Sequence, residues 1–423
     1  MTHPTESPES NLRQSPRQND AYLDPSSSVM SAAPFANSIW PVVLKLAERS
    51  VGLSEPNPRV ACALMAEGQD MIPTGHTQQT GGPHAEVMAL RAAAEQGIEV
   101  RGATAYVTLE PCSHHGRTPP CCDALIAAGV AKVVVATLDP NPLVAGRGVE
   151  RLRAAGIEVE VLPHDHEVAR SVRELNIGFF SRMIRRTPWV RMKMAASLDG
   201  TTALPNGASQ WITGEAARAD GHAWRLRACA VLTGIGTVLE DDPMLDVRAV
   251  PATRQPHLVI VDSRLETPLD ARLWAAPAGG LSRRILIYHA LPEDQARART
   301  PALEARGATL VALPGPGGKV DLAAMLRDLA QREVNELHLE AGHKLNGSFL
   351  REGLVDEVLL YQAPLLLGSG AGLSSLGSLE QLDQGIRLRF QSVNQVGDDL
   401  RILARVQGRD AFLDSPMNVQ TAG

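Results

Sequence analysis

One histidine, one glutamate and two cysteines occur in an order that restricts how this chain can fold. Glu86 follows His84 by two positions, and Cys112 and Cys121 come later in the chain. One imidazole and two thiolates form a three-ligand zinc site, which leaves the fourth tetrahedral position open for water. Any fold of this sequence must therefore bring these side chains to one point.

The local sequence predicts that these residues lie at helix entrances. Because positions i and i+2 of a helix do not face each other, His84 and Glu86 cannot both face one metal from mid-helix. Pro83 suits a helix entrance, so we expect both residues in a first turn. Pro119-Pro120 predict a second helix start beside Cys121. Two helix N-termini at one site favour thiolate over thiol.

This arrangement is typical of a hydrolytic centre. A metal ion lowers the pKa of bound water from ~15.7 to roughly 7, and Glu86 is placed to move protons between that water and a substrate nitrogen. A structural zinc site would need a fourth ligand, for which His114 or His115 is available. H-x-E followed by P-C-x-x-C is the signature of zinc-dependent nucleobase deaminases. The cysteines here are nine positions apart, which indicates a specialised substrate.

Length and charge limit the remaining possibilities. The chain has 423 residues, and domains of ~100–200 residues imply two or three of them. A net charge of −6 argues against nucleic acid as the main partner, because such proteins carry a basic face. No run approaches ~18 apolar residues and no apolar leader opens the chain, so we expect no membrane association and a cytoplasmic location. Cys62, Cys122 and Cys229 are expected to be buried thiols.

Strands alternate with helices in two successive series, which predicts an α/β fold for each. The first series is expected at 36–185, after a polar, disordered tail at 1–35. Its predicted strands are 60–65, 104–108, 132–137 and 158–162, and its helices begin near 39, 84, 121, 148 and 166, the last one ending at 183. The second series is expected at 186–407, before a tail at 408–423. Its predicted strands are 190–195, 230–233, 257–262, 285–288, 309–313, 336–340 and 357–362, followed by a hairpin of 387–393 and 400–406.

The second series carries no motif that defines a reaction by itself. Residues 233–237 and 340–348 each follow a strand and open a helix. Backbone N–H groups at such helix starts bind phosphates. From its residues alone, the second half is a nucleotide-type binding domain.

Several motifs together resemble the bifunctional riboflavin-biosynthesis enzymes, which join a pyrimidine deaminase to a reductase. In the first series these are residues 108–121 (TLEPCSHHGRTPPC) and 139–142 (DPNP), and in the second 196–200 (ASLDG), 209–213 (SQWIT), 241–245 (DDPML) and 354–357 (LVDE). The resemblance implies a cytidine-deaminase-like three-layer domain followed by a dihydrofolate-reductase-like domain. It also implies zinc-dependent deamination of 2,5-diamino-6-(5-phosphoribosylamino)pyrimidin-4-one, then NADPH-dependent reduction of the ribosyl chain to give 5-amino-6-(5-phosphoribitylamino)uracil.

The resemblance further implies individual site residues. Glu86 would be catalytic, and zinc would bind His84, Cys112 and Cys121. Those implied to contact NADPH are Ala195, Trp211, Thr237, Asp241, Ser263, Gly342, His343, Lys344, Leu345, Asn346, Gly347 and Ser348. Those implied to hold the substrate are Ser209, Arg225, Leu245, Arg248 and Glu340. The arginines suit its phosphate, because a guanidinium fork matches phosphate geometry.

Two positions depart from the family pattern, and two other functions compete. Ala61 stands where the family has Gly, and Thr77 where it has His, with His76 beside it. A nucleic-acid base deaminase with an accessory binding domain is the alternative, but it would need a basic stripe beside the zinc pocket. A zinc-stabilised scaffold without catalysis is disfavoured by Glu86. We expect a small phosphoribosylated pyrimidine as partner, no nucleic acid, no membrane, and a homo-oligomer.

Overall fold

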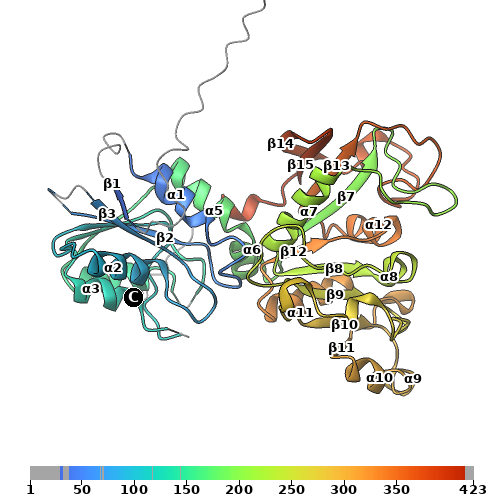
Figure 1. Cartoon of the computed structure of the whole chain (residues 1–423), viewed down its shortest axis with the longest axis horizontal. Helices are drawn as coiled ribbons and strands as arrows, with labels where there is room; N and C mark the ends of the chain where they lie inside the picture. Colours follow the sequence, from blue (N-terminus) through green and yellow to red (C-terminus); the bar gives the residue numbers. More distant parts are fainter. Residues whose placement is uncertain are drawn as a thin grey trace, which may run out of the picture.

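The computed structural model describes residues 29–31, 38–66, 68, 71–116, 118–142 and 144–414. These residues form two sheets that lie side by side, one from each half of the chain (Figure 1). Most of the tail expected at 1–35 lies outside the described residues. Its residues Val29–Ser31 differ from that expectation, because they form the edge strand of the first sheet, antiparallel to residues 71–73. No helix within the described ranges is long and apolar enough to cross a membrane.

The first sheet has six strands in the order β1-β3-β2-β4-β5-β6. Its strands are β1 (Val29–Ser31), β2 (Ala61–Met65), β3 (Met71–His76), β4 (Thr104–Val107), β5 (Lys132–Val135) and β6 (Glu158–Val161). Its helices are α1 (Trp40–Glu48), α2 (Ala85–Glu95), α3 (Cys121–Ala128), α4 (Arg147–Ala154) and α5 (Glu167–Leu175). The pairs among β1, β3, β2 and β4 are antiparallel, whereas β4, β5 and β6 run parallel.

Alternation along the strands places helices on both faces of this sheet. Successive strand side chains point to opposite faces. Val133 and Val135 therefore pack in one core with residues of α2, α3 and α4, and Val134 packs in another with residues of α1 and α5. Figure 1 shows these three layers.

Two local features differ from the sequence-based prediction. The helix predicted at 166–183 is broken at Asn176 into α5 and α6 (Ile177–Arg185). The Asn176 side chain donates to the carbonyl of Arg59 and accepts from its N–H at 2.7 Å, and such side-chain bonds compete with helical ones. Strand β3 was not predicted, because Pro73 and Gly75 interrupt its pattern. Gly75 is required there, since a Cβ would lie 2.2 Å from the carbonyl oxygen of Ala85.

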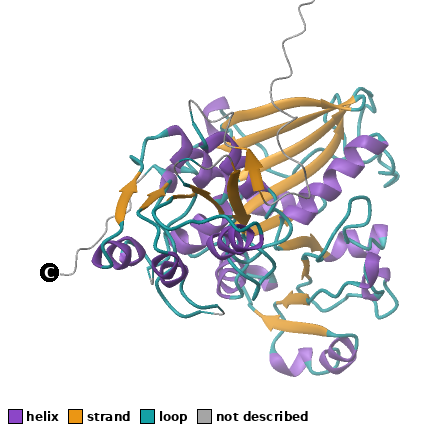
Figure 2. Ribbon diagram, turned by 60° about the vertical axis from the view of Figure 1, so that its left-hand side comes forward, coloured by secondary structure: helices purple, strands orange, loops and turns teal. Residues whose placement is uncertain are grey.

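The second sheet has nine strands in the order β11-β10-β9-β8-β12-β7-β13-β15-β14. They are β7 (Trp189–Ser197), β8 (Ala230–Gly234), β9 (His257–Val261), β10 (Ile285–His289), β11 (Ala308–Ala312), β12 (Glu336–Leu339), β13 (Glu357–Ala363), β14 (Leu388–Val396) and β15 (Asp399–Val406). The helices are α7 (Glu215–Arg227), α8 (Ile235–Asp241), α9 (Glu293–Ala296), α10 (Thr300–Ala305), α11 (Leu322–Gln331) and α12 (His343–Arg351). Figure 2 shows the long strands of this sheet side by side.

The first seven strands in that order are parallel, and the terminal hairpin is antiparallel. Leu232 of β8 packs in a core with residues of α11 and α12, whereas its neighbour Val231 packs with residues of α8 and α10. Strand β12 lies between β8 and β7, so the strand order reverses there. Ligands of open α/β sheets bind at the carboxyl ends of the strands beside such a reversal.

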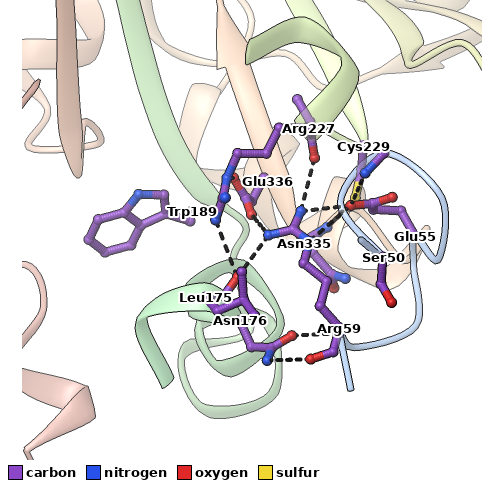
Figure 3. Close-up of polar contacts among 12 residues, drawn as sticks. Ser50, Glu55, Arg59, Leu175, Asn176, Trp189, Arg227, Cys229, Asn335 and Glu336 are labelled. Atoms are coloured by element: carbon purple, nitrogen blue, oxygen red, sulfur yellow. Dashed lines mark hydrogen bonds and ion pairs between the residues drawn. The ribbon is translucent and has the colours of Figure 1, made fainter. Parts of the chain in front are cut away.

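A buried group of charges joins the two halves (Figure 3). Glu336 lies at the start of β12. One oxygen of its carboxylate forms an ion pair with Arg59 of the first half, at 2.7 Å. Its other oxygen forms ion pairs with Arg191 and Arg227, each at 2.9 Å. Burial opposes ionisation of Glu336, but the three guanidinium groups outweigh it and hold the pKa of this carboxyl well below its usual range.

The C-terminal residues that were expected to form a tail add to this junction. A short 3-10 helix, η6 (Ala411–Leu413), packs beside α6. Leu413 is buried in the first half's core, and the Phe412 ring lies 6.2 Å from the ring of Trp189. The described part of the segment 408–423 is therefore packed against the protein.

Replacing Glu336 with Gln is expected to destabilise the protein by about 3 kcal/mol. Removing one partner from a buried charge group costs about 3–5 kcal/mol, because the remaining charges stay buried. The lower end applies here, since Glu55 and Glu357 still neutralise Arg59 and Arg191. The free energy of unfolding in urea measures the change.

The matched control is Glu304→Gln on the exposed face of α10, which should leave the unfolding free energy unchanged. The Glu336 contribution is present above the carboxyl pKa of the unfolded chain. It is lost as the pH falls toward the lower folded-state pKa. The difference between the Glu336 variant and the unmodified protein should therefore shrink in acid, and a difference that grows there would contradict this account.

Candidate active sites

The three predicted zinc ligands lie together in the first half. His84 caps the N-terminus of α2 with extended backbone angles (φ −77°, ψ 171°), and Cys121 is the first residue of α3. The Nδ1 atom of His84 is 3.6 Å from the Cys112 sulfur and 3.3 Å from the Cys121 sulfur. The backbone N–H of Cys121 also donates to the Cys112 sulfur at 3.3 Å.

These separations fit one tetrahedral zinc ion. Zn–N and Zn–S bonds of ~2.1 and ~2.3 Å at a tetrahedral angle place nitrogen and sulfur about 3.6 Å apart. The three ligand atoms all lie within 4.8 Å of one another, and within the described residues no fourth His, Cys, Asp or Glu completes the group. His114 lies on the wall of the adjacent cavity instead.

Glu86 lies beside this cluster in the first turn of α2, as predicted from Pro83. Its side chain is buried. Burial is the main cause that raises the pKa of its carboxyl, and the negative charge of the Cys112 sulfur is the second. A cavity of about 450 Å³ opens in front of His84, Cys112 and Glu86. A buried carboxyl at a cavity wall, next to a metal site, is suited to proton transfer.

Cys122 points away from the cluster. Its sulfur donates to the carbonyl oxygens of Pro111 and Gly148 at 3.3 and 3.5 Å. Cys62 and Cys229 are buried as well. The prediction that these three cysteines are buried thiols is confirmed.

Glu110 and Asp139 were quoted within motifs but given no role by the sequence analysis. Both lie on the cavity wall. The Glu110 carboxylate accepts the backbone N–H groups of Asp139, Gly146, Gly148 and Val149 at 2.9–3.2 Å. Burial raises the pKa of Asp139 to about 7, although the N–H of Asn141 opposes the rise. Glu110 thus holds the loop that carries Asp139. In the sequence, the position of Glu110 directly before Pro111-Cys112 was the signal that could have marked it as a site residue.

The two departures from the family pattern also have defined places. Thr77 lies on the cavity wall, and its hydroxyl accepts the backbone N–H of Val60 at 3.2 Å. Ala61 is fully buried in β2. His76 is outside the cavity lining, and burial lowers the pKa of its imidazole.

In the second half, the residues predicted to bind a nucleotide gather at the carboxyl edge of the sheet. Thr237 lies in α8 directly after β8, Ser263 follows β9, and residues 342–348 follow β12 and begin α12. The two helix starts touch, since a Cβ on Gly234 would lie 3.1 Å from Leu345. Gly342 caps α12 without a side-chain hydrogen bond. The first-turn N–H groups therefore fit an anionic pyrophosphate.

Ala195 lies near the end of β7, and the loop after this strand carries Ser209 and Trp211. Trp211 is 68 % exposed, and the guanidinium of Arg218 lies 4.8 Å from its ring centre. Gln210 contacts Asp241 at the end of α8.

The remaining predicted substrate residues form a second group at this edge. Arg225 of α7 binds both oxygens of Glu340, at 2.5 and 2.8 Å, and donates to the carbonyl of Asp246 at 3.0 Å. Arg248 is half exposed and pairs with Asp246 at 2.7 Å. Leu245 adopts a left-handed backbone (φ 49°) just before these residues. Arg225 is thus engaged with Glu340, whereas Arg248 is paired with Asp246 and remains half exposed to solvent.

Lys193 is a further charged group that sequence reasoning missed. It lies on β7, and its ammonium is 5.9 Å from the ring centre of Tyr361. Burial lowers the pKa of this ammonium, and the Glu340 carboxylate opposes the shift. The available signal was a Lys between two methionines in a predicted strand.

Comparisons with known proteins agree with both halves. The "Cytidine and deoxycytidylate deaminase zinc-binding region" family matches residues 37–137, and the "RibD C-terminal domain" family matches residues 188–402. "Riboflavin biosynthesis protein RibD" of Escherichia coli (strain K12) is 42% identical over 371 residues, which are 84% of this chain and 95% of that protein. The protein of that name from Aquifex aeolicus (strain VF5) is 39% identical over 85% of this chain and 96% of its own.

Solved structures give the same result. Acinetobacter baumannii RibD is 40% identical and has a TM-score of 0.76, covering 87% of this chain and 97% of that one. The chain belongs to the RibD family. The Thermotoga maritima diaminohydroxyphosphoribosylaminopyrimidine deaminase/5-amino-6-(5-phosphoribosylamino)uracil reductase is 31% identical, with a TM-score of 0.72 over 86% of this chain and 97% of that one.

Membership in the RibD family confirms several predictions. The fold is α/β, with a cytidine-deaminase-like domain before a dihydrofolate-reductase-like domain. The protein is a bifunctional enzyme of riboflavin biosynthesis with a zinc-binding deaminase domain and an NADPH-dependent reductase domain. It acts on a small-molecule intermediate of that pathway. A nucleic-acid base deaminase is not favoured.

Proposed function

We propose that the two sites described above carry out two consecutive steps on one phosphoribosylated pyrimidine. The first domain removes the 2-amino group of 2,5-diamino-6-(5-phosphoribosylamino)pyrimidin-4-one by hydrolysis. The second reduces the ribosyl chain of the product to give 5-amino-6-(5-phosphoribitylamino)uracil. The observation that carries this proposal is Glu86 beside the His84, Cys112 and Cys121 cluster, in a chain that also has a RibD reductase domain.

In the deaminase cavity, His84, Cys112 and Cys121 hold zinc, and Glu86 is the catalytic group. A zinc ion bound by these three side chains would supply a coordinated water with a pKa of roughly 7. Glu86 accepts a proton from that water and delivers it to the departing amino nitrogen. Its position supports this role, because the carboxyl is buried at the cavity wall beside the three metal ligands, and general acid–base groups act from such positions.

In the reductase site, the edge loops hold NADPH and the arginine group holds the substrate. NADPH supplies the hydride. We assign the cofactor contacts to Ala195, Trp211, Thr237, Asp241, Ser263, Gly342, His343, Lys344, Leu345, Asn346, Gly347 and Ser348. The substrate contacts are assigned to Ser209, Arg225, Leu245, Arg248 and Glu340. Within this group we assign the phosphate to Arg248, because its side chain is half exposed although it pairs with Asp246, whereas Arg225 is held by both oxygens of Glu340.

We assign the deaminase domain to residues 36–185 and the reductase domain to 186–407, with terminal segments 1–35 and 408–423. A change from one sheet to the other between β6 and β7 supports this division.

Incubation of the zinc-loaded enzyme with the diaminopyrimidine tests both steps. Without NADPH the deaminated intermediate should accumulate, and with NADPH the ribityl product should form. Formation of a reduced but still aminated product would contradict the proposed order.

Replacing Arg248 with Ala should raise the reductase KM for the pyrimidine about tenfold and leave kcat and the NADPH KM unchanged. The phosphate is remote from the carbon that accepts hydride, so its anchor contributes equally to ground and transition states. Charge-assisted hydrogen bonds contribute about 1.5–3 kcal/mol, and the exposure of Arg248 places it at the lower end. Steady-state kinetics with each substrate varied gives both constants.

The control is Arg297→Ala, because Arg297 is an exposed, carboxylate-paired arginine of the same domain. It should change neither KM. A rise in the NADPH KM of the Arg248 variant, with the pyrimidine KM unchanged, would show that Arg248 binds the cofactor.

We further propose that the enzyme is a cytoplasmic homo-oligomer that acts without nucleic acid or membrane. The edge strand β14 supports self-association, because Phe390 is 69 % and Val393 52 % exposed. An open apolar edge strand is a template for pairing with another chain. Sedimentation analysis of the purified protein measures the oligomeric state.

A further inference from the structure

The deaminase cavity is lined in part by a residue of the other domain. Glu333 lies in the turn between α11 and β12 of the reductase sheet, yet it lines the same cavity as Glu86. Asn57 and Arg182 line the cavity on the deaminase side. Glu333 itself is exposed to solvent, which places it at the mouth of the cavity rather than at the zinc cluster.

The turn that carries Glu333 is fixed to the deaminase domain. The amide of Asn335 donates to the carbonyl oxygen of Pro56 at 2.8 Å, and its oxygen accepts from Arg182 at 2.6 Å. The next residue, Glu336, binds Arg59 at 2.7 Å (Figure 3). These bonds hold the turn against the loop that forms one wall of the cavity, so Glu333 has a defined position there.

Close packing of α6 against this turn also holds the turn in place. A Cβ on Gly178 would lie 2.4 Å from the Glu336 side chain and 2.8 Å from the backbone of Asn335. The absence of a side chain at Gly178 allows the approach. The contact between the two domains at this point is therefore direct backbone packing.

The backbone of Glu333 is unfavourable for a residue with a side chain. Its φ is 66°, in the left-handed region that glycine adopts without cost. Gly129 and Gly353 have the same left-handed backbone directly after α3 and α12. The residue that follows each of them donates its backbone N–H to a carbonyl oxygen five positions earlier, in the helix, and Val334 does the same after Glu333. Glutamate in place of the usual glycine indicates that its side chain has a use, because such strain persists mainly at functional sites.

We propose that Glu333 is a specificity-determining residue of the deaminase, supplied by the reductase domain. Its carboxylate accepts a hydrogen bond from a hydroxyl or amino group of the phosphoribosylamino arm of the substrate. This inference rests on the proposed deamination in this cavity.

The test is the deaminase kinetics of the full-length, zinc-loaded enzyme with Glu333→Gln and Glu333→Gly. Both variants should raise the deaminase KM about three- to tenfold with kcat unchanged, less than a buried charge-assisted hydrogen bond would give. The reductase constants for the deaminated substrate should not change. Glu333→Gly should melt at the same temperature or higher, because glycine relieves the left-handed backbone.

The matched control is Arg332→Gln in the same turn. Arg332 is bound to Asp328 at 2.6 Å and does not line the cavity, so its replacement should leave the deaminase KM unchanged. An equal rise in KM for Arg332→Gln, or no rise for either Glu333 variant, would overturn the inference. An unmodified enzyme that does not deaminate would instead overturn the proposed function, and this inference with it.

Discussion

Replacing Glu86 with Gln is expected to reduce deamination by about 10³–10⁴-fold while zinc stays bound. General acid–base groups contribute about 10²–10⁴-fold. The upper end applies because the same carboxylate serves both the attacking water and the departing amino group. Gln keeps the size and buried position of Glu86 but cannot accept a proton. Initial rates together with zinc content of the purified variant measure both parts of the expectation.

The matched control is Glu95→Gln, an exposed carboxylate at the other end of the same helix. It should leave the deamination rate unchanged. In both variants the reductase step on the deaminated substrate should proceed at the normal rate, because the reductase site lies in the other sheet. Loss of zinc in the Glu86 variant would show that Glu86 is a ligand.

The secondary structure of both halves could be predicted largely from local pattern. Apolar runs such as Val133–Val135 and Leu258–Val261 alternate with amphipathic segments, and this periodicity depends only on neighbouring residues. The placement of His84 at a helix entrance was predictable for the same reason, since Pro83 acts locally. The break at Asn176 was not, because its cause is a hydrogen bond to Arg59, distant in sequence.

The candidate site residues also divide into those marked by a local pattern and those that depend on distant contacts. His84, Glu86, Cys112 and Cys121 belong to motifs whose spacing carries the chemistry, so the sequence alone indicated the site. The surroundings of Lys193 and Glu110 come from other elements: Glu340 opposes the lowered pKa of the Lys193 ammonium, and Glu110 accepts the backbone N–H of Gly148. Their roles depend on tertiary contacts that no short pattern encodes.

The junction between the domains was the least accessible feature. Glu336 binds Arg59 across 277 positions of sequence. A lone Glu at the start of a predicted strand is most simply a solvated residue. Only the fold shows that three arginines surround it. The positive φ of Glu333 was hidden in the same way, because the sequence offered no glycine to mark the turn.

Replacing Cys112 or Cys121 with Ala is expected to abolish zinc binding and deamination together, whereas Cys122→Ala should preserve both. Removal of a ligand should cost more than the ~10- to 100-fold in affinity that loss of an outer supporting hydrogen bond costs. Cys122 is the matched control, because it is an equally buried thiol one residue further along α3, and its sulfur donates to the carbonyl oxygens of Pro111 and Gly148.

Metal analysis of the three purified variants, with deaminase and reductase rates measured in parallel, shows which cysteines are zinc ligands. Reduction of the deaminated substrate should survive in all three. Zinc retained in Cys121→Ala but lost in Cys122→Ala would reverse the assignment of the two neighbours.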